Sequence, residues 1–220
     1  MPRKNRVDPF GQIIAVSARG TLMGNRGVIH SSDGSIKKLW RSKSWITCLL
    51  EFKDQKRDIM SSGKYTELFF LDEATSFSAG HRPCSTCRHQ NFKRFKSLWL
   101  SANSHKLGLN ATNIDNIDNI LHTERILPDN TKNIYKEKLC KLPNGTMLSL
   151  SDEDSLAYLL VNGLLLEWSP FGYTNCLRIS PDHLVNVLTP KSVVSTFLGG
   201  YSPNIHYSAS SFIDLEFLES

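Results

Sequence analysis

The chain has 220 residues, of which 40% are hydrophobic and 21% charged. This composition is typical of an ordinary folded protein and excludes a disordered one, and the length suits one domain with a substantial core. The longest apolar stretch, residues 156–168, is interrupted by Asn162, Gly163 and Glu167, so we expect no membrane-spanning segment. The N-terminus is basic but no apolar run follows it, which does not fit a secretory signal. We therefore expect a cytoplasmic protein without membrane contact.

The net charge of +5 is unevenly distributed along the chain. Residues 1–106 contain 19 Lys and Arg against 8 Asp and Glu, whereas residues 107–220 contain 7 against 13. Such asymmetry favours a polyanionic partner that contacts mainly the first half. The alternative is that the charges are spread over all faces and cancel in space. We favour DNA as the partner, either as a duplex or with one base flipped out.

Predicted elements in the first half are mostly strands. Alternating or apolar runs predict strands within residues 12–17, 46–52 and 65–71. Between them lie a glycine-rich loop, residues 19–27, and a segment, residues 37–45, in which basic residues alternate with two tryptophans. The loop lacks the spacing of a phosphate-binding fingerprint. The second segment suits base stacking beside phosphate contacts, and a core-facing tryptophan pair is an equal alternative.

Two helices are predicted around a Gly-to-Cys turn. Residues 72–77 begin with acidic residues, which favour a helix N-terminus. After the turn, Phe92, Phe95, Leu98 and Trp99 recur at helical spacing and predict one buried helix face with basic flanks.

The remaining chain has a different pattern. Residues 107–135 are expected to form a helical connector, because isoleucines recur every three residues at 114–120. Residues 136–220 predict helices over 151–161 and 190–197 and strands over 164–168 and 184–188. We expect an α+β fold with mainly antiparallel sheet and short helices. It would comprise a basic DNA-contacting part (1–106), the connector, and an α+β part (136–220) packed on the first.

The cysteines predict a metal site. Five cysteines, an odd number in a chain without an export signal, favour free thiols or metal ligands over disulfides. Cys84 and Cys87 form a C-x-x-C pair that can turn two thiols toward one tetrahedral ion. Cys48 is the best third ligand on this spacing, and His30, His81 and His89 compete for the fourth position.

Residues 70–88, FLDEATSFSAGHRPCSTCR, resemble the second half of the Ada-type zinc domain, in which a short acidic helix precedes A-G-[FY]-R-P-C-x-x-C. The resemblance covers roughly twenty residues. It implies a DNA-binding domain that holds Zn²⁺ on four cysteines, and in the founding members one of these accepts a methyl group from a DNA phosphotriester. Cys84 and Cys87 match the downstream ligands and Cys48 lies where an upstream one belongs, but the second upstream cysteine is missing. We therefore expect a closed structural Zn²⁺ site of Cys48, Cys84, Cys87 and His30, with no open position for activating water.

Cationic and aromatic residues near this site are the predicted DNA contacts, because they combine phosphate pairing with stacking. They are Arg26, Lys43, Trp45, Arg82, Arg88, His89, Lys93, Arg94 and Lys96.

The leading functional hypothesis is excision of a modified base by hydrolysis of an N-glycosidic bond, in DNA repair or phage defence. This reaction requires a carboxylate near the sugar and a pocket for the flipped base. Glu67, within the apolar run 65–71, is the candidate carboxylate and Asp72 the second. Asn25 and Arg26 are candidates for holding the extruded nucleotide.

Two alternatives remain open on the sequence alone. The first is a zinc-stabilised DNA-binding module without chemistry, or a methyl acceptor of the Ada type. The second is a metal-dependent nuclease, which needs clustered acids. Asp33 with Glu51-Phe52-Lys53 is a fragment of such a pattern.

Overall fold

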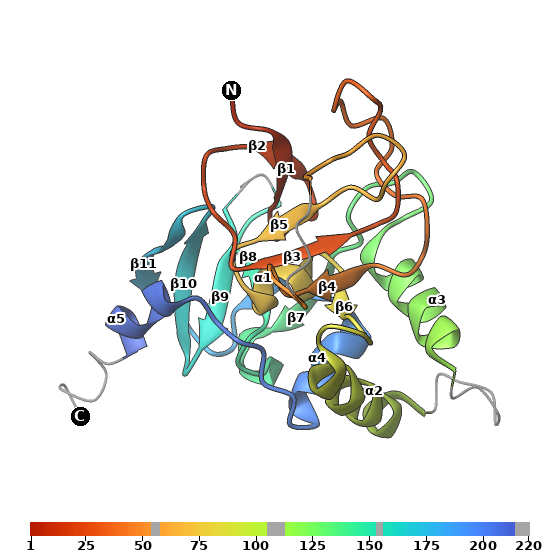
Figure 1. Cartoon of the computed structure of the whole chain (residues 1–220). Helices are drawn as coiled ribbons and strands as arrows, with labels where there is room; N and C mark the ends of the chain where they lie inside the picture. Colours follow the sequence, from red (N-terminus) through yellow and green to blue (C-terminus); the bar gives the residue numbers. More distant parts are fainter. Residues whose placement is uncertain (54–57, 105–112, 153–155, 214–220) are drawn as a thin grey trace.

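The computed structural model describes residues 1–53, 58–104, 113–152 and 156–213. It shows an α+β fold, built from two mostly antiparallel sheets with short helices between and beside them (Figure 1). The predicted fold class is confirmed. Among the described residues, no helix is long and apolar enough to cross a membrane.

The first sheet comes entirely from the basic half of the chain and has the strand order β2-β1-β5-β3-β4-β6. Most neighbours are antiparallel, whereas β1 with β5 and β4 with β6 are parallel. The strands are β1 (Lys4–Val7), β2 (Ile13–Ala15), β3 (Leu22–Asn25), β4 (Ile46–Cys48), β5 (Leu68–Phe70) and β6 (Arg82–Pro83). One face of this sheet packs into the core through Val7, Leu68 and Phe70.

The second sheet is antiparallel throughout, in the order β11-β10-β9-β8-β12-β7. Its strands are β7 (Tyr135–Lys138), β8 (Met147–Ser149), β9 (Tyr158–Val161), β10 (Leu164–Ser169), β11 (Gly172–Leu177) and β12 (Leu184–Val187). Apolar clusters form on both of its faces, so its central strands are buried on both sides.

The helices join the two halves of the chain. They are α1 (Glu73–Ser78), α2 (His89–Asn103), α3 (Ile114–Arg125), α4 (Lys191–Leu198) and α5 (Ser210–Ile213), with 3₁₀ turns at Leu139–Lys141 and Tyr207–Ala209. Phe77, Phe95, Trp99, Ile117 and Phe197 form one cluster from α1, α2, α3 and α4. This aromatic cluster packs the predicted connector and the C-terminal part onto the basic first half of the chain.

Helix α1 is buried along its whole length and lies in the middle of the molecule. The Asp72 side chain caps it, accepting hydrogen bonds from Thr75 N at 2.8 Å, from the Tyr173 hydroxyl at 2.7 Å and from His206 N at 3.0 Å. Glu73 accepts from the Tyr201 hydroxyl at 2.8 Å and from Asn204 N at 2.9 Å. These two carboxylates therefore fasten the C-terminal segment to the centre of the fold.

Four helix predictions are confirmed, and one is wrong. Helices α1, α2 and α4 lie where the sequence placed them, and α3 carries the repeating isoleucines. The predicted helix over 151–161 is contradicted, because residues 158–161 form strand β9; residues 153–155 lie outside the described part. All four residues of β9 are buried, alternately in the two clusters on either face of the sheet. A strand covered on both faces reads as a continuous apolar run, which periodicity alone does not separate from a buried helix.

Candidate metal centre and its surroundings

Three cysteines meet at one edge of the first sheet. Cys48 ends β4, Cys84 follows β6, and Cys87 lies in the turn before α2. The parallel pairing of Thr47 with Pro83, and the hydrogen bond from Cys84 N to Thr47 O at 2.9 Å, place Cys84 beside Cys48. The three sulfur atoms all lie within 4.8 Å of one another.

The C-x-x-C turn brings the thiol of Cys87 close to those of Cys84 and Cys48. Arg88 N donates to Cys84 O at 3.2 Å, which closes the turn, and Thr86 N donates to the Cys84 sulfur at 3.4 Å. A hydrogen bond from the Cys48 thiol lowers the pKa of Cys84 to about 4, and the same contact raises the pKa of Cys48. Burial raises the pKa of Cys87. The contact therefore favours a thiolate at Cys84 with Cys48 as its proton donor.

This group can hold a metal ion. Zinc–thiolate bonds of about 2.3 Å in a tetrahedral site require sulfurs about 3.8 Å apart, which the observed limit of 4.8 Å accommodates. Among the described residues, no histidine, carboxylate or further cysteine joins the group. The chain therefore supplies three soft ligands and leaves a fourth coordination position for a ligand from outside this set.

None of the three histidines considered for the fourth position is part of this group. His30 is buried and its Nδ1 lies 2.6 Å from the Thr66 hydroxyl. His81 is buried with its ring against Phe70 and Trp45, and its Nε2 accepts from Arg26 Nε at 3.3 Å. His89 is exposed and its Nδ1 contacts Ser85 O. The expected closed site with His30 is therefore not formed.

Two arginines of the cysteine turn form buried ion pairs and do not reach solvent. Arg82 holds Asp118 of α3 with two hydrogen bonds of 2.7 Å, and both side chains are about 5% exposed or less. Arg88 pairs with Glu73 at 2.6 Å, again with both partners buried. This burial gives no support to the prediction that Arg82 and Arg88 contact DNA. Both are internal connections that hold the turn to α3 and α1.

The predicted DNA contacts Arg26 and Trp45 are also buried, at 1% and 3% exposure. The guanidinium carbons of Arg26 and Arg125 lie 4.0 and 3.9 Å from the Trp45 ring centroid. Arg125 also donates to Gly80 O and Lys43 O, at 2.9 and 2.7 Å. Burial lowers the pKa of Arg26 to about 9, and burial followed by the charge of Arg26 lowers that of Arg125. Trp45 therefore faces the core and packs against internal cations, as in the alternative to base stacking that the sequence left open.

Gly80 fits this interior closely. Its φ of +86° lies in the left-handed region that favours glycine, and a Cβ atom there would lie 2.4 Å from Arg125 Cδ. The Gly-His-Arg-Pro-Cys run therefore packs against α3 at Gly80, beside Arg125, and at Arg82, which pairs with Asp118. Its cysteine, Cys84, belongs to the candidate metal site.

We expect a further cation near this interior, the half-buried Lys132, to make stability depend on pH. Lys132 donates to Ser78 O, and burial lowers its pKa to about 7. Between pH 7 and about 10 the unfolded chain binds the Lys132 proton and the folded chain does not, so this residue makes stability rise with pH. The stability of wild type relative to Lys132→Met should therefore increase from pH 7 to 9, by at most ~1.4 kcal/mol per pH unit. Urea unfolding of both proteins at pH 7, 8 and 9 measures this, and a difference that does not change with pH would contradict the assignment.

The remaining predicted contacts lie at the surface. His89, Lys93 and Arg94 of α2 are exposed, Lys96 is half-buried, and Lys43 is exposed with its Nζ 2.9 Å from Asn119 Oδ1. Arg94 donates to Gly200 O at 2.8 Å. These cations lie on both sides of the cysteine group in the chain, before β4 and after Cys87.

The side chains proposed for base excision, Glu67, Asp72 and Asn25, do not share an accessible space. Glu67 is 3% exposed and accepts from Met60 N at 2.7 Å. Asp72 is 2% exposed and bound to the donors that cap α1 and hold the C-terminal segment. Asn25 is half-buried and accepts from Gly27 N. Glu67 and Asp72 are enclosed by their hydrogen-bond partners, so this geometry gives base excision no support.

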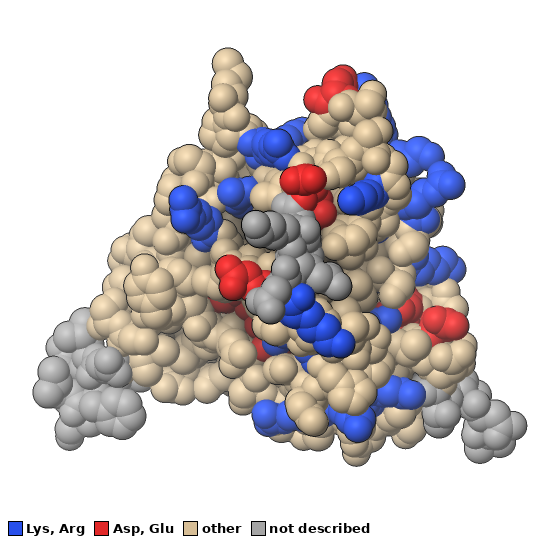
Figure 2. Space-filling model, viewed as in Figure 1, with Lys and Arg blue, Asp and Glu red and all other residues tan. Residues whose placement is uncertain are grey.

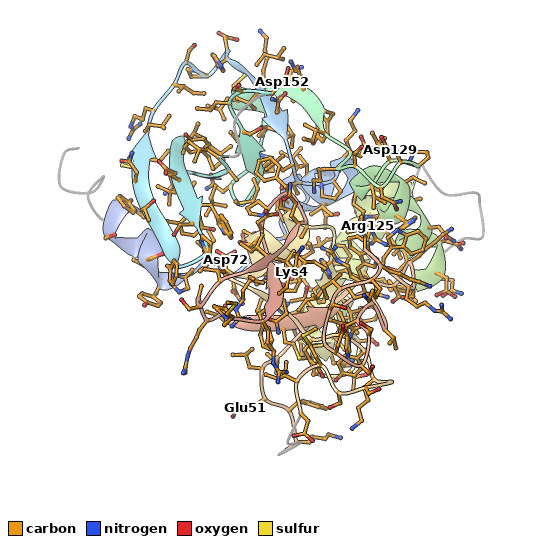
Figure 3. The ribbon with its side chains drawn as sticks, turned by 90° about the horizontal axis from the view of Figure 1, so that it is seen from above. Lys4, Glu51, Asp72, Arg125, Asp129 and Asp152 are labelled. Atoms are coloured by element: carbon orange, nitrogen blue, oxygen red, sulfur yellow. The ribbon has the colours of Figure 1, made fainter. Side chains whose placement is uncertain are left out.

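The acidic residues considered for a nuclease site do not lie together either. Asp33 is exposed and bonds within its own turn, to Ser31 and Ser35. Figure 3 shows Glu51 and Asp152 at opposite edges of the molecule with Asp72 between them. The three-cysteine group is the metal-ligating cluster formed by the described residues, and no carboxylate cluster accompanies it there.

Sequence reasoning missed Asp118, Glu73 and Arg125 as partners of the cysteine turn. For Asp118 a signal was present, because it lies one residue after Ile117 and three before Leu121, on the apolar face of α3. An acid on a buried helix face requires a partner, and a basic residue of the cysteine turn was the available one. Comparisons of the chain with family models, with curated proteins and with solved structures found no match.

Proposed function

We propose that this chain is a metal-thiolate protein that binds nucleic acid, with Zn²⁺ held by Cys48, Cys84 and Cys87 and with DNA on the basic surface around them. The observation that carries the proposal is the gathering of three sulfurs within 4.8 Å between two exposed basic segments. Zn²⁺ is the ion that fits best, because three cysteine ligands are typical of its sites.

The basic surface consists of two segments, and we define it by its exposed members. These are Lys37, Lys38, Arg41 and Lys43 before β4, and His89, Lys93 and Arg94 on α2. Figure 2 shows Lys and Arg side chains around the first sheet and along α2, whereas the lower left of this face, over the lower ends of β9–β11, is mostly tan. Basic side chains concentrated in this way are the electrostatic footprint of nucleic-acid binding.

An aromatic hollow adjoins the first basic segment. Trp40 and His122 pack in a T-shaped, edge-to-face arrangement with ring centroids 4.4 Å apart, and they line a hollow of about 270 Å³. Trp40 Nε1 is held by Asn130 Oδ1 at 3.2 Å, which fixes the indole. An aromatic side chain among cations suits stacking on an unpaired base. Trp40 thus takes the stacking role that Trp45 cannot fill from the interior.

Neutralising part of the basic surface should weaken DNA binding without affecting the fold. We expect the triple variant Lys37→Gln, Lys38→Gln and Lys93→Gln to bind a DNA duplex less tightly. Its plot of log affinity against log salt concentration should be shallower by about 2–3, since each phosphate contact contributes ~0.9 to that slope. Fluorescence anisotropy with a labelled duplex at several salt concentrations measures both quantities.

The second sheet offers a matched control. Lys136→Gln, Lys138→Gln and Lys141→Gln remove the same charge from exposed lysines of β7 and the turn that follows it. Affinity and salt dependence should stay near wild type in this control. Equal losses in both triple variants would show that binding follows net charge alone and would contradict the proposed surface.

A further inference from the structure

A single row of side chains crosses the outer face of the first sheet from the thiol group to an arginine. Cys48 pairs with Met23, Met23 with Phe69, and Phe69 with Arg6 in successive strands β4, β3, β5 and β1. Side chains at paired positions point to the same face of a sheet. Phe69 is therefore two strands from Cys48, a backbone separation of about 10 Å. Phe69 and the cysteines also pack around Met23 as one cluster.

A pocket of about 440 Å³ lies at the far end of this row. Its cationic lining is Arg3, Arg6 and Arg19, and its apolar walls include Leu50, Ile59 and Phe69. The volume is within the range of about 300–1,000 Å³ that is usual for small-molecule sites. None of the described residues that line it is acidic. Three guanidinium groups without an acidic neighbour in the lining predict an anionic ligand.

Two of the three arginines are held in position by the protein. Arg3 donates to Ile59 O and Arg6 donates to Ala18 O. The Arg6 guanidinium lies over the Phe69 ring, 4.9 Å from its centroid. Arg19, in contrast, is exposed and forms no hydrogen bond or ion pair with any described residue. Among the residues that the structure describes, it is the pocket arginine whose donors are all unpaired.

The loop that carries Arg19 is pressed against the sheet. A Cβ atom at Gly20 would lie 2.4 Å from Phe70 O, so the backbone approaches β5 as closely as glycine allows. Thr21 N donates to Phe70 O at 3.0 Å and fixes the loop there. Arg19 therefore extends from an anchored backbone beside the apolar walls.

The two kinds of lining correspond to the two ends of a nucleotide. Guanidinium forks match phosphate oxygens, and an apolar wall with an aromatic ring suits a base. We propose that this arginine pocket binds one 5′-phosphorylated nucleotide, with the phosphate on Arg19 and the base against Leu50, Ile59 and Phe69. The inference rests on the proposed function, because it makes the pocket the nucleotide-holding part of the same sheet face as the thiol group. It moves the extruded nucleotide from Asn25 and Arg26, which the sequence suggested, to this pocket.

Calorimetric titration of the full-length, zinc-loaded protein with dAMP tests the proposal, using deoxyadenosine and inorganic phosphate as the two halves of the ligand. We expect dAMP to bind at one site and each half to bind at least tenfold more weakly. Arg19→Ala should weaken dAMP binding at least tenfold, since it removes the free guanidinium from an exposed position. Lys141→Ala, which removes an exposed charge from the other sheet, should leave dAMP binding unchanged.

Several results would overturn this inference. They are no saturable dAMP binding at millimolar concentration, equal binding in the Arg19→Ala variant, and inorganic phosphate binding as tightly as dAMP. Competition of dAMP by a 5′-phosphorylated oligonucleotide, but not by its unphosphorylated form, would support the pocket with a nucleic-acid end as ligand. Failure of both to compete would support it with a free nucleotide as ligand.

Duplex binding, measured separately, distinguishes the two proposals. If wild type binds duplex but not dAMP, the pocket inference fails and the proposed function stands. If it binds dAMP but no duplex at any salt concentration, the pocket stands and the proposed function fails.

Discussion

Replacing Asp118 by Asn should lower the free energy of unfolding by about 3–5 kcal/mol. Asp118 is the partner of Arg82, through two hydrogen bonds of 2.7 Å between side chains that are 5% exposed or less. The amide keeps the size of the side chain but leaves the Arg82 charge buried without a counter-charge. Removing one partner of a buried ion pair costs this much because the remaining charge cannot return to water.

Urea unfolding followed by far-ultraviolet circular dichroism measures this effect. Asp152→Asn is a suitable control, since Asp152 forms the same kind of pair with Lys136 at 3.1 Å while its side chain is 70% exposed. Exposed ion pairs contribute little to the free energy of unfolding, so the control should unfold at nearly the same urea concentration as wild type. Equal small effects in the two variants would show that the Arg82–Asp118 pair is not enclosed as described.

The second large effect is expected at the cysteine group. Cys84→Ser should abolish stoichiometric zinc binding, because serine is a poor ligand and only Cys48 and Cys87 would remain. Metal that binds only the folded chain stabilises it. If the variant loses about 3 kcal/mol of stabilisation by bound metal, its Tm should fall by about 6–12 °C for a chain of this length.

Cys140→Ser provides the matched control. Cys140 is a free thiol like the others, but it is exposed and lies in the turn after β7, in the other sheet. Zinc content by inductively coupled plasma mass spectrometry, after dialysis against a weak chelator, should be one ion per chain in this control and in wild type. Wild-type protein that retains no metal, or Cys84→Ser protein that retains all of it, would contradict the assignment.

Much of the local structure could be predicted from patterns that depend on neighbouring residues. Asp72 caps α1 and the apolar spacing of Phe95 and Trp99 gives the buried face of α2, because caps and helical periodicity are local properties. The C-x-x-C turn could be predicted for the same reason, since both of its thiols belong to one turn, whereas the approach of Cys48 depends on the pairing of β4 with β6.

The site residues that turned out to be buried have a common physical explanation. A charged residue type in the sequence does not show whether its side chain is exposed or is paired in the interior. Arg82 and Arg88 were predicted as DNA contacts because they are cationic and adjoin the cysteines. Their counter-charges, Asp118 and Glu73, come from α3 and α1, and only the tertiary packing brings them into range. The same packing encloses Asp72, whose donors Tyr173 and His206 lie more than a hundred residues away.

The position of the expected fourth ligand depends on tertiary structure in the same way. His30 forms an isolated bridge with Ile36, and its side chain contacts Thr66. Whether a histidine reaches a metal site depends on which strands are neighbours. The sheet order places β3, and not the segment of His30, next to Cys48.

If the three-cysteine group and the basic surface act as one functional face, zinc loading should control DNA binding. Fluorescence anisotropy of a labelled DNA duplex with zinc-loaded, chelator-stripped and zinc-restored protein at one salt concentration tests this most directly. We expect tight binding by the loaded protein, weaker binding after stripping, and recovery when zinc is restored. No duplex binding by the loaded protein, or identical binding in all three states, would contradict it.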